Sequence, residues 1–322
     1  MKKIFMTGGC GFIGSHLTER LVSEGYTVRI YDNLHRNAVQ YTDVLNHANI
    51  EFIQGDITIP EELERAMKGC DMVLHMAAIA GVSSYHKFPA KTVQVNLIGT
   101  FYVLEAMRKN GITRLIDMST SEVFGTEVIE ASENSYLRIG PPHDKRWSYA
   151  VSKIAGEQMI YRYSEEYNWD VTIVRPFNVY GPRQVGEGAI SNFCKWAIDG
   201  ENLRIDGLGS SIRSWCYITD FIEAMMCFIN KPNKNAEAFN VGSPWTSVAN
   251  HYLAELIIEF AKKDPKVEIK PAISYHPMPY TDIKVRWPDI SKMIDTYGWK
   301  PKVGIQEGVY NTYKWFSDTF KK

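Results

Sequence analysis

Short apolar runs alternate with longer amphipathic stretches through the first half of the chain. Six runs have the length and composition of buried β-strands: 4–6, 27–31, 51–53, 72–74, 114–118 and 171–174. Four segments repeat apolar residues at helical spacing: 12–23, 60–68, 89–109 and 148–167. Because parallel strands need crossover helices between them, this alternation predicts an α/β fold with a doubly wound parallel sheet.

The alternation ends after Pro176, where glycine and proline become frequent and the segments are irregular. We therefore expect a first domain over 1–176 and, over 177–322, mostly a smaller C-terminal lobe. The run 238–241 has the composition of another buried strand, so some segments of this second half are expected to return to the sheet.

Composition and charge narrow the function classes. The 36 basic and 37 acidic residues leave a formal net charge of -1 without long runs of either sign, which does not favour a nucleic-acid-binding surface. The five cysteines are spread singly, with no paired Cys or His spacing, so we expect reduced thiols in a cytoplasmic protein and no metal site. No stretch approaches the ~20 apolar residues of a membrane span, and we expect no membrane partner.

A glycine-rich turn follows the first predicted strand and opens the first predicted helix. Gly8, Gly11 and Gly14 give it the GxxGxxG spacing, which suits a tight turn and a close approach of the backbone to a pyrophosphate. Asp32 ends the second predicted strand, where it would accept hydrogen bonds from ribose hydroxyls and repel a 2′-phosphate. Together these features predict a Rossmann domain that prefers NAD to NADP. Asp56, after the third strand, is a candidate adenine contact or an ordinary turn aspartate.

Tyr149 and Lys153 lie four residues apart in a predicted helix and so share one of its faces. A tyrosine must lose its proton to act as a base, and its ordinary pKa is about 10. A nearby ammonium and a cationic nicotinamide would both stabilise the phenolate. The predicted strand 114–118 runs into the segment 119–122, which places hydroxyls and a carboxylate at the strand end where open α/β sheets bind ligands. These residues predict a site that oxidises an alcohol.

With these motifs the chain resembles an extended short-chain dehydrogenase/reductase of the nucleotide-sugar epimerase, dehydratase and decarboxylase group. The resemblance covers nearly the whole chain and rests on segments in family order: TGGCGFIGSHL, YDNL, GDI, HMAA, STSEVFG, YAVSK, RPFNVYGPR, IRSWCYITD and RWPDISK. Several motifs in order are much more specific than any one of them. The resemblance implies NAD as the cofactor and a nucleotide-diphosphate sugar as the substrate, bound mostly by the C-terminal lobe.

The resemblance also assigns roles to residues. Tyr149 would take the proton from the sugar 4-hydroxyl with help from Thr120, and Lys153 would hold the nicotinamide ribose. The residues expected to contact the cofactor are Gly8, Gly11, Phe12, Ile13, Gly14, Asp32, Asn33, Asp56, Ile57, Ala77, Ala78, Ser119, Tyr149, Lys153 and Pro176. Those expected to contact the substrate are Ser83, Tyr85, Ser121, Asn178, Arg183, Arg213, Tyr217 and Arg286. Guanidinium groups suit a diphosphate because they bind it through two parallel hydrogen bonds.

A 4-keto sugar is activated at carbon 5, so the same first step leads to several reactions. The Ser-Thr-Ser-Glu pattern that ends at Glu122 resembles UDP-glucuronate decarboxylases and also GDP-mannose-type dehydratases. The stretch 140–147 before Tyr149 and the segment 83–85 favour the decarboxylases, whereas Phe124 stands where the family usually has tyrosine. We expect a second step assisted by Glu122, with decarboxylation of a UDP-glucuronate-type substrate favoured.

Other interpretations stay open on sequence alone. They are a 4,6-dehydratase acting on a GDP- or dTDP-sugar, a 4-epimerase, a dehydrogenase that releases a keto sugar, an NADPH-dependent reductase of a small ketone, and a non-catalytic NAD-binding regulator. A regulator would be expected to lose Tyr149 or Lys153, and both are present. The segments 89–109 and 148–167 form a helical bundle between subunits in relatives, so the resemblance implies a homodimer.

Overall fold

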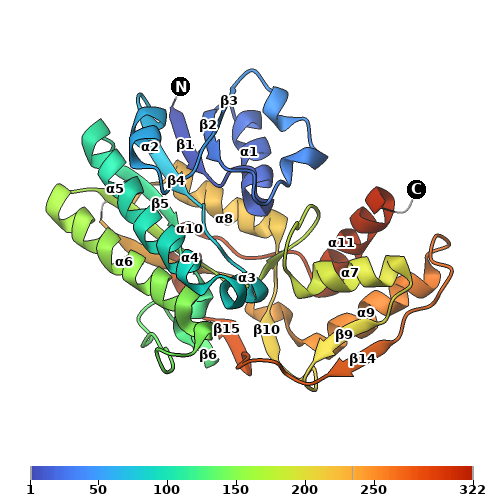
Figure 1. Ribbon diagram of the computed structural model, residues 1–322. Coiled ribbons are helices and arrows are strands. Elements are labelled where there is room, and N and C mark those ends of the chain that lie inside the picture. The colour runs from blue at the N-terminus through green and yellow to red at the C-terminus, as the bar shows by residue number, and fades with distance from the viewer. Residues whose placement is uncertain (1, 234, 321–322) are drawn as a thin grey trace. The chain divides into compact units, whose positions relative to one another are not determined.

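The computed structural model describes residues 2–233 and 235–320, which fall into two compact units (Figure 1). The first unit is built from Met1–Val123, Tyr136–Pro176 and Ile222–Phe239, and the second from Phe124–Ser135, Phe177–Phe221 and Asn240–Lys322. Residues 124–135 precede Pro176 along the chain but belong to the second unit, because their strand pairs with strands there.

A seven-stranded sheet organises the first unit. Its spatial order is β12 (Glu237–Val241), β7 (Asp170–Pro176), β5 (Arg114–Met118), β4 (Met72–His75), β1 (Lys3–Thr7), β2 (Thr27–Asp32) and β3 (Ile50–Gln54). The neighbouring pairs from β7 through to β3 are all parallel. This order confirms the predicted doubly wound α/β fold, and the run 238–241 does return to the sheet.

Helices cover both faces of this sheet. In Figure 1, α2 (Pro60–Met67), α5 (Gly99–Asn110) and α6 (Ser148–Tyr167) lie on one side, and α1 (Phe12–Ser23) and α8 (Ile218–Asn230) lie on the other. An ion pair of 2.6 Å between Arg20 and Glu223 joins α1 to α8. The bounds of α1, α6 and β5 are those predicted from the apolar spacing, because each has a continuous buried face.

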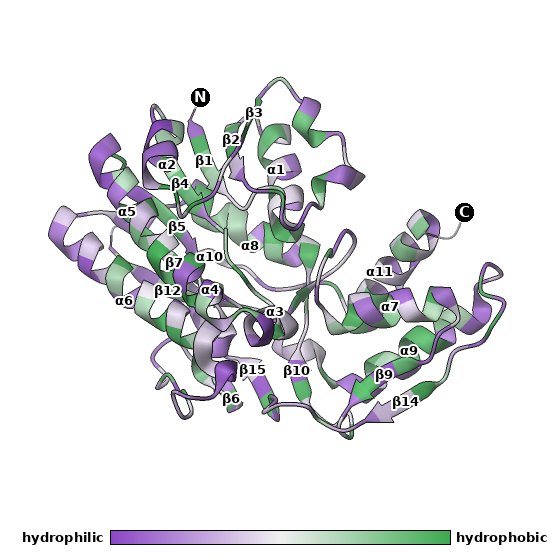
Figure 2. Ribbon diagram, viewed as in Figure 1, coloured by the Kyte–Doolittle hydropathy of each residue, from purple (hydrophilic) through white to green (hydrophobic). Residues whose placement is uncertain are grey.

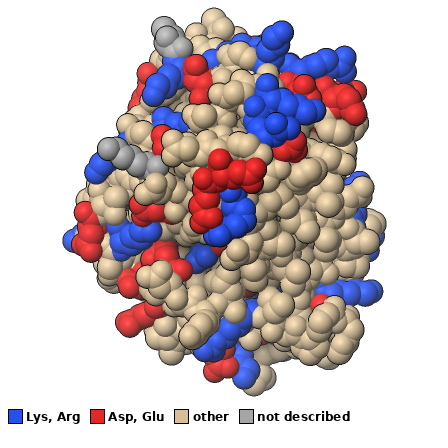
Figure 3. Space-filling model, turned by 90° about the vertical axis from the view of Figure 1, so that its left-hand side faces the viewer, with Lys and Arg blue, Asp and Glu red and all other residues tan. Residues whose placement is uncertain are grey.

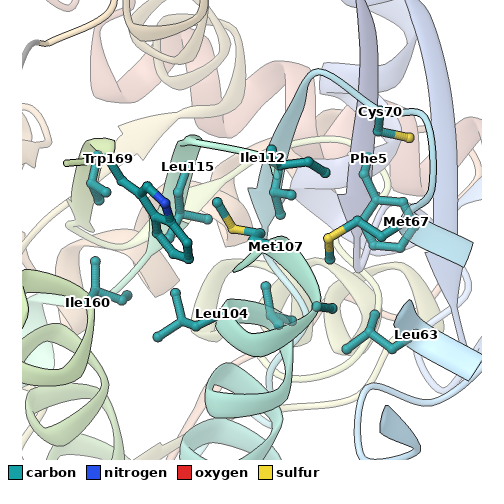
Figure 4. Close-up of a cluster of buried hydrophobic side chains, with 14 of the residues drawn as sticks. Phe5, Leu63, Met67, Cys70, Leu104, Met107, Ile112, Leu115, Ile160 and Trp169 are labelled. Atoms are coloured by element: carbon teal, nitrogen blue, oxygen red, sulfur yellow. The ribbon is translucent and has the colours of Figure 1, made fainter. Parts of the chain in front are cut away.

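The core of the first unit lies between the sheet and the helices of the α5 side. Its apolar side chains come from six strands and three helices. Figure 4 shows part of this cluster, including Phe5, Leu63, Met67, Leu104, Met107, Leu115 and Ile160. Hydrophobic residues concentrate on the strands, whereas α5 and α6 carry both hydrophobic and hydrophilic positions (Figure 2). Burial of these faces supplies the main driving force that fixes the strand ends in place.

The segment 89–109, predicted to be helical, is helical throughout but does not form one regular α-helix. The segment forms α4 (Pro89–Val93), a π-helical turn η3 (Gln94–Ile98) and then α5. Asn96 in this turn is buried, and its side chain accepts a hydrogen bond from the Ile79 amide (2.8 Å) and donates to the Ile79 carbonyl (3.0 Å). The turn therefore holds the segment after β4 in place. A π turn of this kind is frequent beside functional sites.

The second unit contains a four-stranded sheet of β13 (Ser247–Ala249), β10 (Ile212–Ser214), β15 (Val285–Pro288) and β6 (Glu127–Ala131). Two strand pairs accompany it: β8 (Val179–Tyr180) with β11 (Cys216–Tyr217), and β9 (Leu203–Asp206) with β14 (Ile273–His276). Its helices are α7 (Ala189–Asp199), α9 (Asn250–Lys263), α10 (Ser291–Tyr297) and α11 (Ile305–Phe320), of which α7, α9 and α11 contact one another.

Candidate active site

The loop after β1 is packed so closely that it requires glycine at two positions. Gly8 has a φ of 72°, and a Cβ there would lie 2.7 Å from the backbone nitrogen of Ala77. A Cβ on Gly14 would lie 2.5 Å from the carbonyl oxygen of Gly8. No side chain caps the N-terminus of α1 at Gly11. This cradle of bare backbone at a helix N-terminus fits a pyrophosphate.

Asp32 joins the end of β2 to the glycine loop. One carboxylate oxygen accepts a hydrogen bond from the Leu34 amide (2.7 Å), and the other accepts one from the Cys10 amide (3.0 Å). Burial raises the pKa of Asp32, and these two backbone hydrogen bonds oppose that shift. Each carboxylate oxygen can accept a further hydrogen bond, so this geometry is compatible with the expected contact to the ribose hydroxyls.

The other residues expected at the cofactor lie near the same edge of the sheet. The Asp56 carboxylate accepts hydrogen bonds from the amide and hydroxyl of Thr58 and, at 3.4 Å, from the Asn33 side chain. The Ile57 side chain is buried in the core beside Gly99, so its backbone is the part that could face a ligand, and the cofactor contact of Ile57 stays a prediction. Four further residues lie in the first turn of α1 or directly after β4: Phe12, Ile13, Ala77 and Ala78. Pro176 ends β7.

Tyr149 and Lys153 occupy the first two turns of α6, and Thr120 follows β5. All three side chains are buried, and Thr120 forms a hydrogen bond with the Tyr149 hydroxyl. Lys153 donates a hydrogen bond of 2.7 Å to the carbonyl of Met118, the last residue of β5. The structure thus brings together the three residues expected for the oxidation.

Burial raises the pKa of Tyr149 to about 12. The hydrogen bond from Thr120 lowers this pKa, and the negative charge of Glu122 raises it. Without a cofactor the phenol is therefore protonated at neutral pH. A positive charge next to the hydroxyl would stabilise the phenolate and bring its pKa closer to the working range.

Glu122 lies in the 3-10 turn η4 (Ser121–Phe124) and is held by Arg146. The Arg146 guanidinium forms a short ion pair with the Glu122 carboxylate and donates a second hydrogen bond to the Tyr85 hydroxyl at 2.6 Å. The Tyr85 ring stacks on the Tyr149 ring, with centroids 6.0 Å apart and an interplanar angle of 8°. Tyr85, which we expected at the substrate, therefore also packs against the candidate base. Ser121 is buried beside Glu122, and Ser83 is exposed on α3 (Val82–Lys87).

Arg146 is a residue of this site that we did not expect from the sequence. It lies three residues before Tyr149, but its partners Tyr85 and Glu122 are 61 and 24 residues away along the chain. Spacing between neighbouring residues cannot show contacts between residues so far apart in the sequence. The sequence feature that could have indicated Arg146 is its position inside the stretch 140–147.

Buried polar side chains of the sheet and of α6 lie close to these residues. Ser119 donates a short hydrogen bond to Glu157, which also forms an ion pair of 2.6 Å with Arg175. Burial raises the pKa of Asp117 to about 6, and the charge of Lys153 opposes this shift. His75 lies between the hydroxyls of two threonines, and burial lowers its pKa to about 3, so it is neutral. Ser119, which the sequence predicts at the cofactor, is therefore hydrogen-bonded to a buried ion pair.

The second unit carries the remaining residues expected to bind the substrate. Arg213 on β10 is the register partner of Arg286 on β15, and because the strands are parallel both side chains leave the same face of the sheet. Arg213 forms an ion pair of 2.6 Å with Asp282, and Arg286 donates to the Gly125 carbonyl at 3.0 Å. The side chain of Asn178 donates to the Ser214 carbonyl at 2.9 Å.

Arg183 and Tyr217, the last two residues expected to bind the substrate, are buried. Arg183 has a φ of 64°, a left-handed conformation that is uncommon outside glycine. Tyr217 ends β11, and burial raises the pKa of its hydroxyl, which is hydrogen-bonded to Asn311. Ser83, Tyr85 and Ser121 belong to the first unit, so the expected substrate residues are divided between the two units.

Two further properties concern ions and membranes. In the ranges 2–233 and 235–320, no three His, Cys, Asp or Glu side chains are grouped so that they could hold a metal ion. No helix of these ranges combines the length and the apolar character needed to cross a membrane.

Comparison with known proteins decides the family. Residues 4–242 match the model of the NAD dependent epimerase/dehydratase family. The chain belongs to this family. NAD is accordingly the cofactor, which fits the glycine cradle and Asp32, and the protein is an enzyme of the nucleotide-sugar-modifying type.

Two relatives and one solved structure are similar to this chain over most of its length. A UDP-N-acetyl-alpha-D-glucosaminuronate decarboxylase from Bacillus cytotoxicus is 32% identical over 98% of this chain and 98% of its own. UDP-glucuronic acid decarboxylase 6 from Arabidopsis thaliana is 34% identical over 95% of this chain and 86% of its own. Among solved structures, a UDP-glucose 4-epimerase from Thermotoga maritima with UDP-glucose has a TM-score of 0.87 and 29% identity, covering 98% of this chain and 99% of its own.

The position of Tyr149 leads to a prediction about its ionisation. We expect the phenolate to form at lower pH in the NAD-loaded protein than in the cofactor-free protein, where burial holds the pKa at about 12. The measurement is an alkaline titration of phenolate absorbance, taken as the difference between wild type and Tyr149→Phe. Loading with NADH, whose ring is uncharged, is the control and should give a smaller shift. Superimposable titrations with and without NAD would contradict this account of the site.

Proposed function

We propose that this protein is a nucleotide-uronate decarboxylase that oxidises the sugar 4-hydroxyl and then releases the carboxyl group at carbon 5 as carbon dioxide. The observation that carries the proposal is the carboxylate of Glu122, held beside Tyr149 by the buried Arg146. The names of the relatives from Bacillus cytotoxicus and Arabidopsis thaliana support it. Their substrates favour UDP as the nucleotide.

The first step removes two hydrogens from carbon 4. Tyr149, as the phenolate, accepts the proton of the 4-hydroxyl, and the Thr120 hydroxyl supports it by hydrogen bonding. When bound, NAD supplies the acceptor for the hydride of carbon 4 and returns it at the end of the cycle. Lys153, which donates a hydrogen bond to the Met118 carbonyl, would orient the ribose next to Tyr149.

The second step follows from the chemistry of the oxidised sugar. A uronate with a ketone at carbon 4 is a β-keto acid, so the bond between carbons 5 and 6 breaks and its electron pair moves onto the oxygen at carbon 4. Carbon dioxide leaves, carbon 5 then receives a proton, and the ketone is reduced again. No base is needed to remove the proton of carbon 5.

This chemistry agrees with the ion pair that Glu122 forms with Arg146. A 4,6-dehydratase must take a proton from carbon 5, and a carboxylate that is engaged by a guanidinium is a poorer proton acceptor. The ion pair with Arg146 therefore favours decarboxylation over dehydration. We assign Glu122 to the second step, because its carboxylate lies close enough to Tyr149 to act on that hydroxyl.

We further propose that the diphosphate is bound by the guanidinium groups of the second unit. Arg213 and Arg286 leave the same face of their sheet, and planar guanidinium groups match phosphate oxygens. The uridine and the sugar would be contacted by the other residues expected there: Ser83, Tyr85, Ser121, Asn178, Arg183 and Tyr217.

We also propose a homodimer formed through α5 and α6, and a cytoplasmic location. Phe101 on α5 and Val151 and Tyr167 on α6 are partly exposed hydrophobic side chains. Figure 3 shows a wide area without charged residues on the side of the molecule where these helices lie. Exposed hydrophobic side chains in an area without charges are typical of subunit interfaces. The five free cysteines agree with a reducing compartment.

The experiment that tests the proposal is incubation of the NAD-loaded protein with a panel of nucleotide sugars. We expect UDP-glucuronate or UDP-N-acetylglucosaminuronate to lose the mass of carbon dioxide. UDP-glucose serves as the control without a carboxyl group and should keep its mass. Loss of water would indicate a dehydratase, loss of two hydrogens a net dehydrogenase, and an unchanged mass with an inverted carbon 4 an epimerase. Any of these three as the main reaction would overturn the proposal.

Substitution of the candidate base gives a second prediction. Tyr149→Phe keeps the ring that stacks on Tyr85 but removes the hydroxyl, so we expect turnover to fall by about 10²–10⁴-fold while NAD still binds. Tyr167→Phe, at the exposed end of the same helix, is the matched control and should leave turnover unchanged. Retention of most turnover in Tyr149→Phe would remove Tyr149 from the reaction.

A further inference from the structure

Arg146 is an unusually well enclosed positive charge. Its side chain is 1% exposed, and its guanidinium lies 5.5 Å from the centre of the Tyr85 ring and 5.7 Å from that of Trp147. A buried guanidinium is costly unless it is paired. It forms an ion pair with Glu122, whose side chain is 17% exposed.

The backbone holds this side chain in one place. Arg146 belongs to the 3-10 turn η5 (Lys145–Trp147), which leads directly into α6. The Asp144 carboxylate accepts a hydrogen bond of 2.9 Å from the Arg146 amide and so caps the turn. On the far side, the Tyr85 hydroxyl accepts from the guanidinium, and the Tyr85 ring contacts the ring of Tyr149. The charge is therefore fixed relative to the reacting centre.

The ion pair between Glu122 and Arg146 offsets a negative charge beside Tyr149. Glu122 alone would place a negative charge beside Tyr149, and this charge raises the pKa of the Tyr149 hydroxyl. A uronate brings a second carboxylate to the same place, and two like charges in a poorly solvated site repel each other strongly. A neutral hexose meets no such repulsion.

We propose that Arg146 is a positioning residue that makes the site accept a negatively charged sugar, by neutralising Glu122 and fixing its carboxylate. The inference rests on the proposed decarboxylation of a nucleotide uronate. It predicts that removal of the Arg146 charge and removal of the Glu122 charge shift the preference between a uronate and a neutral sugar in opposite directions. A residue that only stabilised the fold would change the binding of both sugars alike.

The experiment measures the affinity of NAD-loaded protein for UDP-glucuronate and UDP-glucose, in a Tyr149→Phe background that prevents turnover. In Arg146→Met the guanidinium no longer offsets the negative charge of Glu122, which should lower the preference for UDP-glucuronate by about tenfold or more. In Glu122→Gln the carboxylate no longer offsets the positive charge of Arg146, which should raise that preference. The double variant Glu122→Gln with Arg146→Met, which carries neither charge, should return close to the parent value.

Two controls make the outcome decisive. Lys145→Met removes an exposed positive charge next to Arg146, and we expect it to leave the preference unchanged. If Arg146→Met does not fold, Glu122→Gln still tests the inference, because it must shift the preference toward the uronate. Equal losses for both sugars, or shifts in the same direction in the two single variants, would overturn it. Failure of the proposed function is seen separately, as absence of carbon dioxide loss in the wild-type protein.

Discussion

The parallel pairing of the strands in the first unit is the constraint on which the candidate site depends. Parallel strands end at the same edge of a sheet, and the chain reverses its direction of winding at β1, which lies between β2 and β4. The loops after these strands therefore meet. The contact is so close that a Cβ on Gly8, after β1, would collide with Ala77, after β4. The same geometry brings Asp32 against the glycine loop.

Several charged side chains of the first unit lie near the carboxyl end of β5. Glu122 with Arg146 and Glu157 with Arg175 form two ion pairs, and Lys153 lies between β5 and α6. Buried ion pairs add little net stability, because desolvation offsets their attraction, but removal of one partner is costly. Their value here is that they fix positions. The tyrosine, the carboxylate and the ammonium are held by rigid elements rather than by mobile loops.

The sequence predicts the elements whose pattern is local. The bounds of α1 and β5 follow from apolar spacing, and the glycine loop, Asp32 and the Tyr149–Lys153 spacing are visible as motifs. The π turn at 94–98 is not visible, because Asn96 bonds to Ile79 across the fold. For the same reason the sequence does not show the contacts of Arg146.

The fold leaves the reaction open, since proteins named as an epimerase and as decarboxylases are similar to this chain over nearly its full length. The pairing of Glu122 with Arg146 separates decarboxylation from dehydration in our account. A free carboxylate at this position would suit removal of a proton from carbon 5. A paired one suits a sugar that loses its own carboxyl group, for which the electrons come from the breaking carbon–carbon bond.

The most direct test follows the hydrogen on carbon 4 of the sugar. UDP-glucuronate carrying deuterium at carbon 4 is converted by the NAD-loaded protein, and the product is analysed by mass spectrometry and NMR. The account predicts a product that has lost carbon dioxide and still carries the deuterium at carbon 4, because the hydride leaves and returns within one cycle. A decarboxylated product without deuterium at carbon 4, or a product that keeps its carboxyl group, would contradict it.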